Sequence, residues 1–212
     1  MSASPYKQLE QEFKRVHAFR GAIALLRWDA AVMMPRGSAD VRGEQLAALE
    51  TEHHALLTAP RITRLLERAQ VNAQGLTDWQ VANLREMRRQ RDHAIATPAS
   101  LVSRLARATA RAEAQWLTAR QQGKFERFAP HLEEVVSLVR DKAALLGQAL
   151  NLSPYDALID EFSPGISSAD IDAVFKTISR RLPSLIREVI ALQDPQPLQP
   201  LSGKFAPSKQ RA

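Results

Sequence analysis

The sequence of 212 residues contains no cysteine, and this absence excludes several kinds of chemistry. Without thiols the chain can form no disulfide, no thiolate metal site and no cysteine nucleophile. Aromatic residues make up only 6% of the chain, which is too sparse for a base-stacking surface of the kind that binds single-stranded nucleic acid. The function therefore has to be sought in the helices, the charges and the histidines.

Long hydrophobic runs are also missing. The sequence has no stretch of uncharged apolar residues as long as a membrane-spanning helix requires. Its first residues, MSASPYKQLE, lack the apolar core of a signal peptide and soon carry charge. We therefore expect a cytoplasmic protein that has no contact with a membrane.

Histidines are few, and their spacing excludes the commonest zinc-protease motif. In that motif, H-E-x-x-H, two imidazoles one helical turn apart bind the metal and the glutamate activates a water molecule. The five histidines are His17, His53, His54, His93 and His131, and no two stand four residues apart. Glu50 to His53 forms an E-x-x-H unit of the di-iron type, but a second such unit is absent. We therefore predict no catalytic residue and no metal site in this chain.

What the sequence does contain is helical periodicity. Apolar residues recur at spacings of three and four along nearly the whole chain, as on the buried face of an amphipathic helix. The segment Thr77-Asp78-Trp79-Gln80 is a capping box that starts one helix, and Gly147 is expected to close another. Ser167 or Ser168 is expected to cap the last helix. The fold class predicted is all-α, with about eight helices and no sheet.

Two regions are expected. Residues 1–193 form the helical region, and residues 194–212 form an extended linker because Asp194 to Pro200 contains three prolines. The last helix, from about Ser168 to Ile190, carries an apolar stripe wider than a one-sided helix needs. We expect part of this stripe to stay uncovered and to drive self-association, most simply as a homodimer.

One segment, from Leu26 to His54, is more specific. It contains L-R-W-D-A-A-V-M-M-P-R-G, then R-G-E-Q-L-A-A-L, then a histidine five residues after that last leucine. This pattern resembles the amino-terminal signature of the thermostable metallocarboxypeptidases, the carboxypeptidase Taq family. Val32 stands where that family usually has threonine. Further segments, such as Phe128 to Leu132 and Pro154 to Phe175, are also similar to the family.

The resemblance implies an activity and a cofactor. Members of the family release single residues from the carboxyl ends of peptides and use a divalent metal, Zn²⁺ or Co²⁺, held by an H-E-x-x-H helix much further along the chain. The tail LSGKFAPSKQR resembles the segment that leads into the catalytic half. We therefore expect the amino-terminal helical part of such an enzyme, which is inactive by itself and holds no metal cofactor of its own. Peptide substrates and a homodimer are implied for the complete enzyme.

Five residues of the signature are candidate site residues, and two interpretations of them stay open: Trp28, Asp29, Arg42, Gln45 and His54. In the structural interpretation the indole of Trp28 fills the core, and Asp29 accepts hydrogen bonds from the backbone or from Arg42. In the functional interpretation the Trp28-Asp29 segment lines a substrate groove in the complete enzyme. His54, at an apolar-periodic position, is expected to pack between helices as a hydrogen-bonded residue.

Two other functions remain to be considered, and the net charge of +6 bears on the first of them. A basic helical protein can bind nucleic acid, but here the cations are mixed with Glu and Asp along the helices, which is typical of solvated helix faces. This pattern argues against nucleic acid as a partner. The second alternative is a non-catalytic helical module that binds other proteins.

Overall fold

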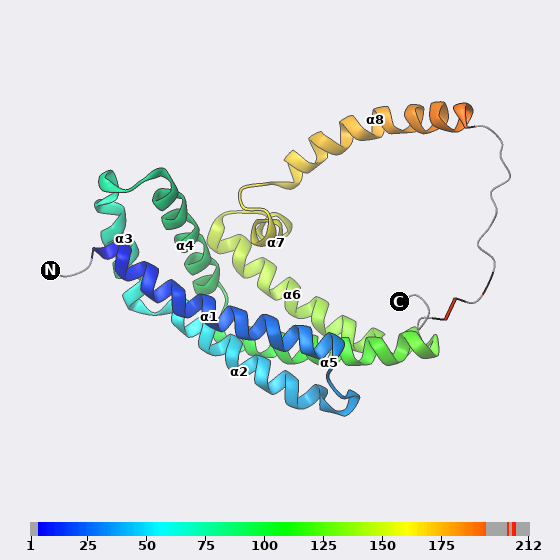
Figure 1. The fold of residues 1–212 in the computed structure, drawn as a ribbon, viewed down its shortest axis with the longest axis horizontal. Coiled ribbons are helices and arrows are strands. Elements are labelled where there is room, and N and C mark those ends of the chain that lie inside the picture. The colour runs from blue at the N-terminus through cyan, green and yellow to red at the C-terminus, as the bar shows by residue number, and fades with distance from the viewer. Residues whose placement is uncertain (1–3, 194–202, 204, 207–212) are drawn as a thin grey trace. The chain divides into compact units, whose positions relative to one another are not determined.

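The computed structural model describes residues 4–193, 203 and 205–206. The helices are α1 Pro5–Val32, α2 Ala39–Thr58, α3 Pro60–Val71, α4 Asp78–Ala96, α5 Ala99–Gln122, α6 Ala129–Leu150, α7 Pro154–Phe162 and α8 Ser168–Leu192 (Figure 1). Short 3-10 turns lie at Arg36–Ser38, Ala73–Gly75 and Phe125–Arg127. No strand occurs among the described residues. The predicted fold class, all-α with about eight helices, is confirmed.

Several helix ends lie where the sequence predicts them. The capping box of α4 is formed: the hydroxyl of Thr77 accepts from the amide of Gln80, and the Gln80 side chain accepts from the amide of Thr77. Helix α8 begins after Ser167, whose side chain forms the corresponding box with Asp170. These polar side chains satisfy amides that have no partner within the helix, which fixes where each helix starts.

The prediction that Gly147 closes a helix is wrong. Helix α6 continues to Leu150 and ends at Asn151, which adopts the left-handed conformation with φ 55°. Gly147 is buried within the last turns, and a Cβ there would lie only 2.9 Å from the carbonyl oxygen of Leu152. The glycine is therefore needed because the chain folds back closely over the helix, and not because the helix stops.

The chain divides into two compact units, Met1–Ile166 and Ser167–Ala212. In the first unit one buried cluster joins α1, α3 and α4 through Leu9, Ile62, Leu65, Leu66, Ala69, Leu84 and Met87. A second cluster joins α5 and α6 through Leu101, Ala108 and Leu138. Helix α2 packs along α5, where a Cβ on Gly43 would lie 3.5 Å from the Cβ of Ala110. Small residues thus let these two helices approach closely.

The second unit consists, as far as it is described, mainly of α8, and none of its helical residues is buried. Its large apolar side chains are exposed: Val174, Phe175, Ile178, Leu182, Leu185, Ile186, Val189, Ile190 and Leu192. The predicted linker, residues 194–212, lies almost entirely outside the described residues. Among the described helices, none is long and apolar enough to cross a membrane.

Candidate functional site: a polar groove in the first unit

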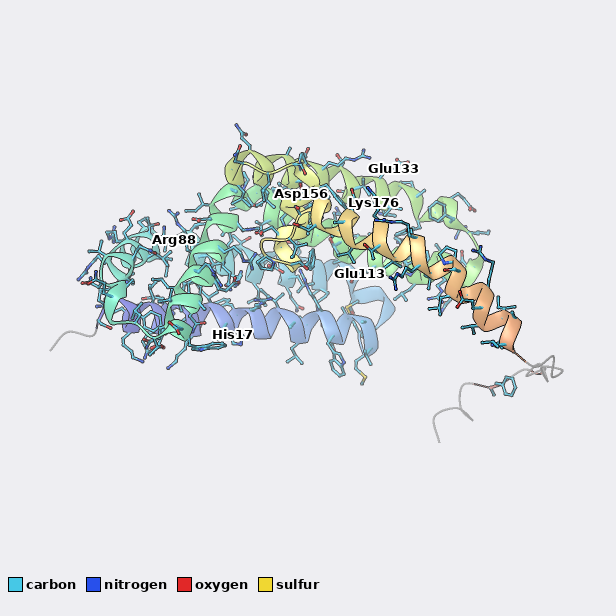
Figure 2. All side chains as sticks on the ribbon, turned by 90° about the horizontal axis from the view of Figure 1, so that it is seen from above. His17, Arg88, Glu113, Glu133, Asp156 and Lys176 are labelled. Carbon is cyan, nitrogen blue, oxygen red and sulfur yellow. The ribbon has the colours of Figure 1, made fainter. Side chains whose placement is uncertain are left out.

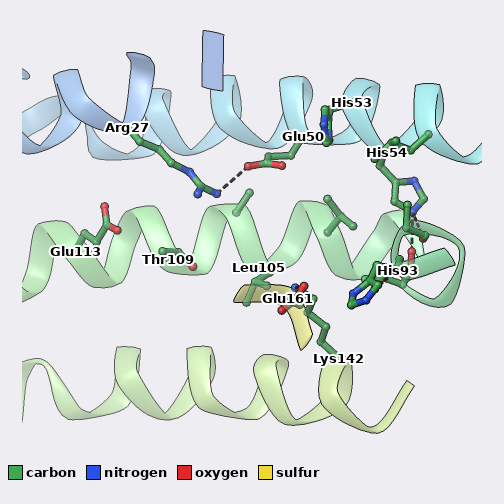
Figure 3. Close-up of a pocket in the computed structure, with 15 residues that line it drawn as sticks. Arg27, Glu50, His53, His54, His93, Leu105, Thr109, Glu113, Lys142 and Glu161 are labelled. Carbon is green, nitrogen blue, oxygen red and sulfur yellow. Dashed lines mark hydrogen bonds and ion pairs between the residues drawn. The ribbon is translucent and has the colours of Figure 1, made fainter. Parts of the chain in front are cut away.

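A polar groove runs between the helices of the first unit. It consists of two adjoining cavities of about 480 and 440 Å³, which share the lining residues Arg27, Glu50, His53, Leu57, His93 and Glu161. These residues come from α1, α2, α4 and α7, and α5 contributes Thr109 and Glu113 to one wall (Figure 3). The polar groove is therefore the place where charged groups from most helices of the unit meet.

Most carboxylates of the polar groove are paired with a cation. Arg27 reaches across from α1, and its Nη2 lies 2.7 Å from Oε1 of Glu50 on α2. Lys142 on α6 donates to Glu161 on α7 (Figure 3 shows both pairs). The Lys142 and Glu161 side chains are each about a quarter exposed, so water and salt screen this pair less than a surface pair. The pairs hold the helices at a set distance around the groove.

Asp160 of α7 ties the groove to α4. Its Oδ2 accepts from Nε2 of His93 at 2.8 Å, and its Oδ1 accepts from the amide of Gly165 at 2.8 Å. Burial would raise the pKa of Asp160, but those hydrogen bonds and the positive charges of His93 and Arg89 outweigh it and hold the pKa below its usual value. The ionised carboxylate therefore orders both α7 and the turn that precedes α8.

The imidazole of His53 lines the polar groove and can act both as a hydrogen-bond donor and as an acceptor. Burial lowers the pKa of His53, the charge of Glu50 opposes this, and the neighbouring Arg20 and His54 lower it further. The neutral ring, with one nitrogen that donates and one that accepts, can form hydrogen bonds to a peptide group in the groove.

His54 has a different role. Its Nε2 lies 2.9 Å from the carbonyl oxygen of Ala94 and 2.7 Å from that of Thr97 (Figure 3). Two carbonyl acceptors require a protonated Nε2, so the ring joins α2 to the end of α4. The prediction that His54 is a hydrogen-bonded packing residue is confirmed.

Arg42 organises the rest of the signature. Its guanidinium donates to the carbonyl oxygen of Leu26 at 2.6 Å, to Oδ2 of Asp29 at 2.6 Å and to Oε1 of Gln45 at 3.0 Å. The arginine side chain is only 14% exposed. Asp29 therefore accepts from Arg42, as the structural interpretation expects, and this set of bonds fixes the turn between α1 and α2.

The expectation that Trp28 fills the core is wrong for this chain, because its side chain is 56% exposed. The buried face of α1 is formed by Tyr6, Leu9, Val16 and Ile23. Trp28 follows Ile23 by five residues, which places it about 140° around the helix at 3.6 residues per turn. Of the five signature residues, only His54 lines the polar groove; Trp28, Asp29, Arg42 and Gln45 lie outside it.

A catalytic metal does not fit the side chains at hand. Within the part of the chain that the structure describes, no three His, Cys, Asp or Glu side chains gather as a metal site would require. In the E-x-x-H unit, Glu50 is engaged by Arg27. Sequence reasoning missed Glu161, Lys142 and the bond between His93 and Asp160, because pairs between distant segments leave no local spacing signal.

Solved structures with a similar fold include carboxypeptidases. One described as Trypanosoma Cruzi Metallocarboxypeptidase 1 matches with a TM-score of 0.72 and 32% identity, over 98% of this chain and 42% of that chain. A Pyrococcus furiosus carboxypeptidase matches with a TM-score of 0.69 and 26% identity, over 90% and 38% of the two chains. This chain thus matches less than half the length of each of these two solved chains.

The sequence comparisons identify the family. The model of the carboxypeptidase Taq (M32) metallopeptidases matches residues 8–212. Thermostable carboxypeptidase 1 of Thermus thermophilus is 32% identical over 191 residues, and that of Pyrococcus furiosus is 27% identical over 184 residues. The chain belongs to the carboxypeptidase Taq (M32) metallopeptidase family, as its signature suggested. It covers 84% and 87% of its own length in these matches, but only 37% and 36% of the two relatives.

Proposed function

We propose that this chain is the amino-terminal helical part of a metallocarboxypeptidase that releases carboxyl-terminal amino acids from peptides. The family match over residues 8–212 is the observation that carries the proposal. The polar groove would form one wall of the substrate cleft in the complete enzyme. Its neutral His53 and the hydroxyl of Thr109 would form hydrogen bonds to the peptide, while the ion pairs keep the wall rigid.

The catalytic metal, Zn²⁺ or Co²⁺, belongs in this proposal to the remainder of the complete enzyme. The sequence has no H-E-x-x-H motif, and the described side chains do not fit a metal site. When bound, a divalent metal of this kind activates water for peptide hydrolysis. The residues of this chain would contribute binding, orientation and restricted access to chain ends, in a cytoplasmic enzyme.

The test compares two proteins. The first is a complete reading frame that joins this chain to an H-E-x-x-H segment, and the second is the 212-residue chain alone. Release of carboxyl-terminal amino acids from peptides is measured with Zn²⁺ or Co²⁺ and again after chelation. We expect metal-dependent release from the complete enzyme only. Metal-dependent release by the 212-residue chain, or stoichiometric metal retained by it after dialysis, would contradict the proposal.

A non-catalytic interaction module is the second candidate, and one observation favours it. Every large apolar side chain of α8 from Val174 to Leu192 is exposed, and an apolar surface of this kind is typical of a protein contact. If a complete reading frame with an intact metal motif shows no peptidase activity on any peptide, this candidate replaces the first.

A further inference from the structure

A second groove adjoins the polar groove and lies between α1 and α4. This α1–α4 groove has a volume of about 550 Å³, and Lys14, His17, Arg20, Met87 and Gln90 are among the residues that line it. It shares Arg20 and Gln90 with the neighbouring cavity of the polar groove. Figure 2 shows His17 on α1, and Arg88 marks α4. A ligand in the polar groove could therefore continue into the α1–α4 groove.

The charges of the α1–α4 groove are not balanced. Its carboxylates are Glu10 and Glu86. Lys7 pairs with Glu10 at 2.7 Å, and Arg89 pairs with Glu86 at 2.8 Å. The pKa of Glu86 is lowered, chiefly by the hydrogen bond from Arg89. Both acids are therefore already neutralised by a cation.

The basic side chains on the α1 wall, in contrast, have no such partner. Lys14, His17 and Arg20 form no ion pair with a carboxylate among the described residues. Their spacing of three places them along one side of α1, one turn after another. The wall of the α1–α4 groove thus presents a row of basic side chains with which a negatively charged ligand can form ion pairs.

The floor of the α1–α4 groove is apolar. Phe13, Val16 and Met87 line it, and Val16 and Met87 are only 3% and 8% exposed. Gln90 at the junction of the two grooves donates to Oε1 of Glu86 at 2.9 Å, and its amide oxygen can accept from a peptide backbone. An apolar floor with a few polar groups at the rim is the usual composition of a ligand site.

We propose that the α1–α4 groove binds a peptide segment in which acidic side chains alternate with apolar ones. The acidic side chains would meet Lys14 and Arg20, and the apolar ones would lie on Phe13 and Met87. This proposal rests on the proposed function, because it assigns the substrate residues farther from the cleaved end to this groove. A nucleic acid fits less well, since the apolar floor of Phe13, Val16 and Met87 offers no partner to its phosphates.

The test measures binding to the 212-residue chain directly. The probes are a fluorescent peptide of alternating Glu and Leu and its counterpart of the same length in which Lys replaces Glu. Anisotropy is followed for the wild type, for the groove variant Lys14→Gln/Arg20→Gln, and for the control Arg64→Gln/Arg68→Gln. Arg64 and Arg68 lie exposed on α3 and line neither groove, so the control loses the same charge elsewhere.

We expect the wild type to prefer the acidic peptide and the groove variant to bind it about fivefold more weakly, as the loss of two exposed ion pairs implies. The control should stay within about twofold of the wild type. An equal loss in both variants would overturn the proposal, because general charge would then explain the binding. Equal affinity for the Lys peptide, or tighter binding of a single-stranded oligonucleotide that the groove variant abolishes, would also overturn it.

The complete enzyme separates this inference from the proposed function. There, Lys14→Gln, which changes a residue that lines the α1–α4 groove and not the polar groove, should raise KM for acidic peptides more than for peptides without acidic residues, because in this proposal the groove binds the acidic segment. An active enzyme whose KM does not respond contradicts the groove proposal alone. A complete enzyme without peptidase activity contradicts the proposed function, whatever the groove binds.

Discussion

Helices α6 and α8 have similar lengths and similar apolar patterns, but α6 has a buried face and α8 has none. Helix α6 has 22 residues and buries Leu138, Ala143, Leu146 and Gly147. Helix α8 has 25 residues, carries nine exposed large apolar side chains and buries none. The periodic pattern indicates which face of each helix can be buried, and only the helices packed around it decide whether that face is buried.

The difference also shows where stability resides. Burying a leucine side chain contributes roughly 1.5–3 kcal/mol to folding. The first unit collects such contributions in its clusters, whereas the apolar stripe of α8 can contribute only when another surface covers it. We therefore expect substitutions in the two regions to affect different measurements, namely unfolding in the first unit and association in α8.

The largest effect is expected from Leu146→Ala. Leu146 is fully buried in α6, and removing such a side chain leaves a cavity, which costs about 2–5 kcal/mol. The matched variant Leu182→Ala changes the same side chain on α8, where it is 45% exposed, and should cost less than about 1 kcal/mol. Urea unfolding of the monomeric protein measures both. Equal losses would show that α8 is part of the same packed core.

Arg42→Ala should have the next largest effect. It removes three hydrogen bonds and leaves Asp29 without its partner, and a bond to a charged group contributes about 1.5–3 kcal/mol. We expect a loss of about 2 kcal/mol in the free energy of unfolding. Arg42→Lys should recover little of it, because an ammonium cannot reproduce the planar guanidinium geometry. A neutral Arg42→Ala variant would show that this turn does not depend on the signature bonds.

The sequence predicted the helices well, because helix starts and apolar periodicity are local signals. The capping box at Thr77 and the cap of α8 at Ser167 could both be predicted from a few neighbouring residues. The polar groove could not be predicted in this way. Its pair of Lys142 and Glu161 and its bond between His93 and Asp160 join segments 19 and 67 residues apart. The exposure of Trp28 could not be predicted for a related reason, since the aromatic character of a residue says little about which side of a helix it occupies.

The next largest effect is expected on self-association through α8. The exposed stripe on α8 includes Leu182 and Ile186, and an exposed apolar stripe of this size tends to pair. We expect a dimer in sedimentation experiments and at least a tenfold weaker association in Leu182→Lys/Ile186→Lys, equivalent to about 1.4 kcal/mol. Thr177→Lys/Arg181→Ala on the same helix serves as the control. A monodisperse monomer at high concentration would favour a self-sufficient module over part of a larger enzyme.

The pH dependence of stability tests His53. Its lowered pKa means that the folded state takes up a proton less readily than the unfolded state, for which the value is near 6.5. Stability from this group is therefore fully present above that value and is lost as the pH falls through the lowered pKa. His53→Gln should flatten this slope, which urea unfolding at several pH values measures. The stability that Asp160 contributes is also lost in acid, but only below the ordinary range of a carboxyl group, near pH 4. The two losses of stability can therefore be separated.

The smallest effect is expected from Trp28→Ala. A core tryptophan would cost roughly 3–5 kcal/mol on truncation, but the indole of Trp28 is 56% exposed, so we expect a loss of only about 0.5–1 kcal/mol. Thermal unfolding of dilute protein measures this loss, and the same scan on the complete enzyme tests whether another surface covers the indole there. A large loss in the complete enzyme alone would place Trp28 at a contact between its parts. A large loss already in the dilute 212-residue chain would mean that the face of α1 that carries Trp28 is packed as well. The contrast between packed and uncovered helix faces would then have to be revised for α1.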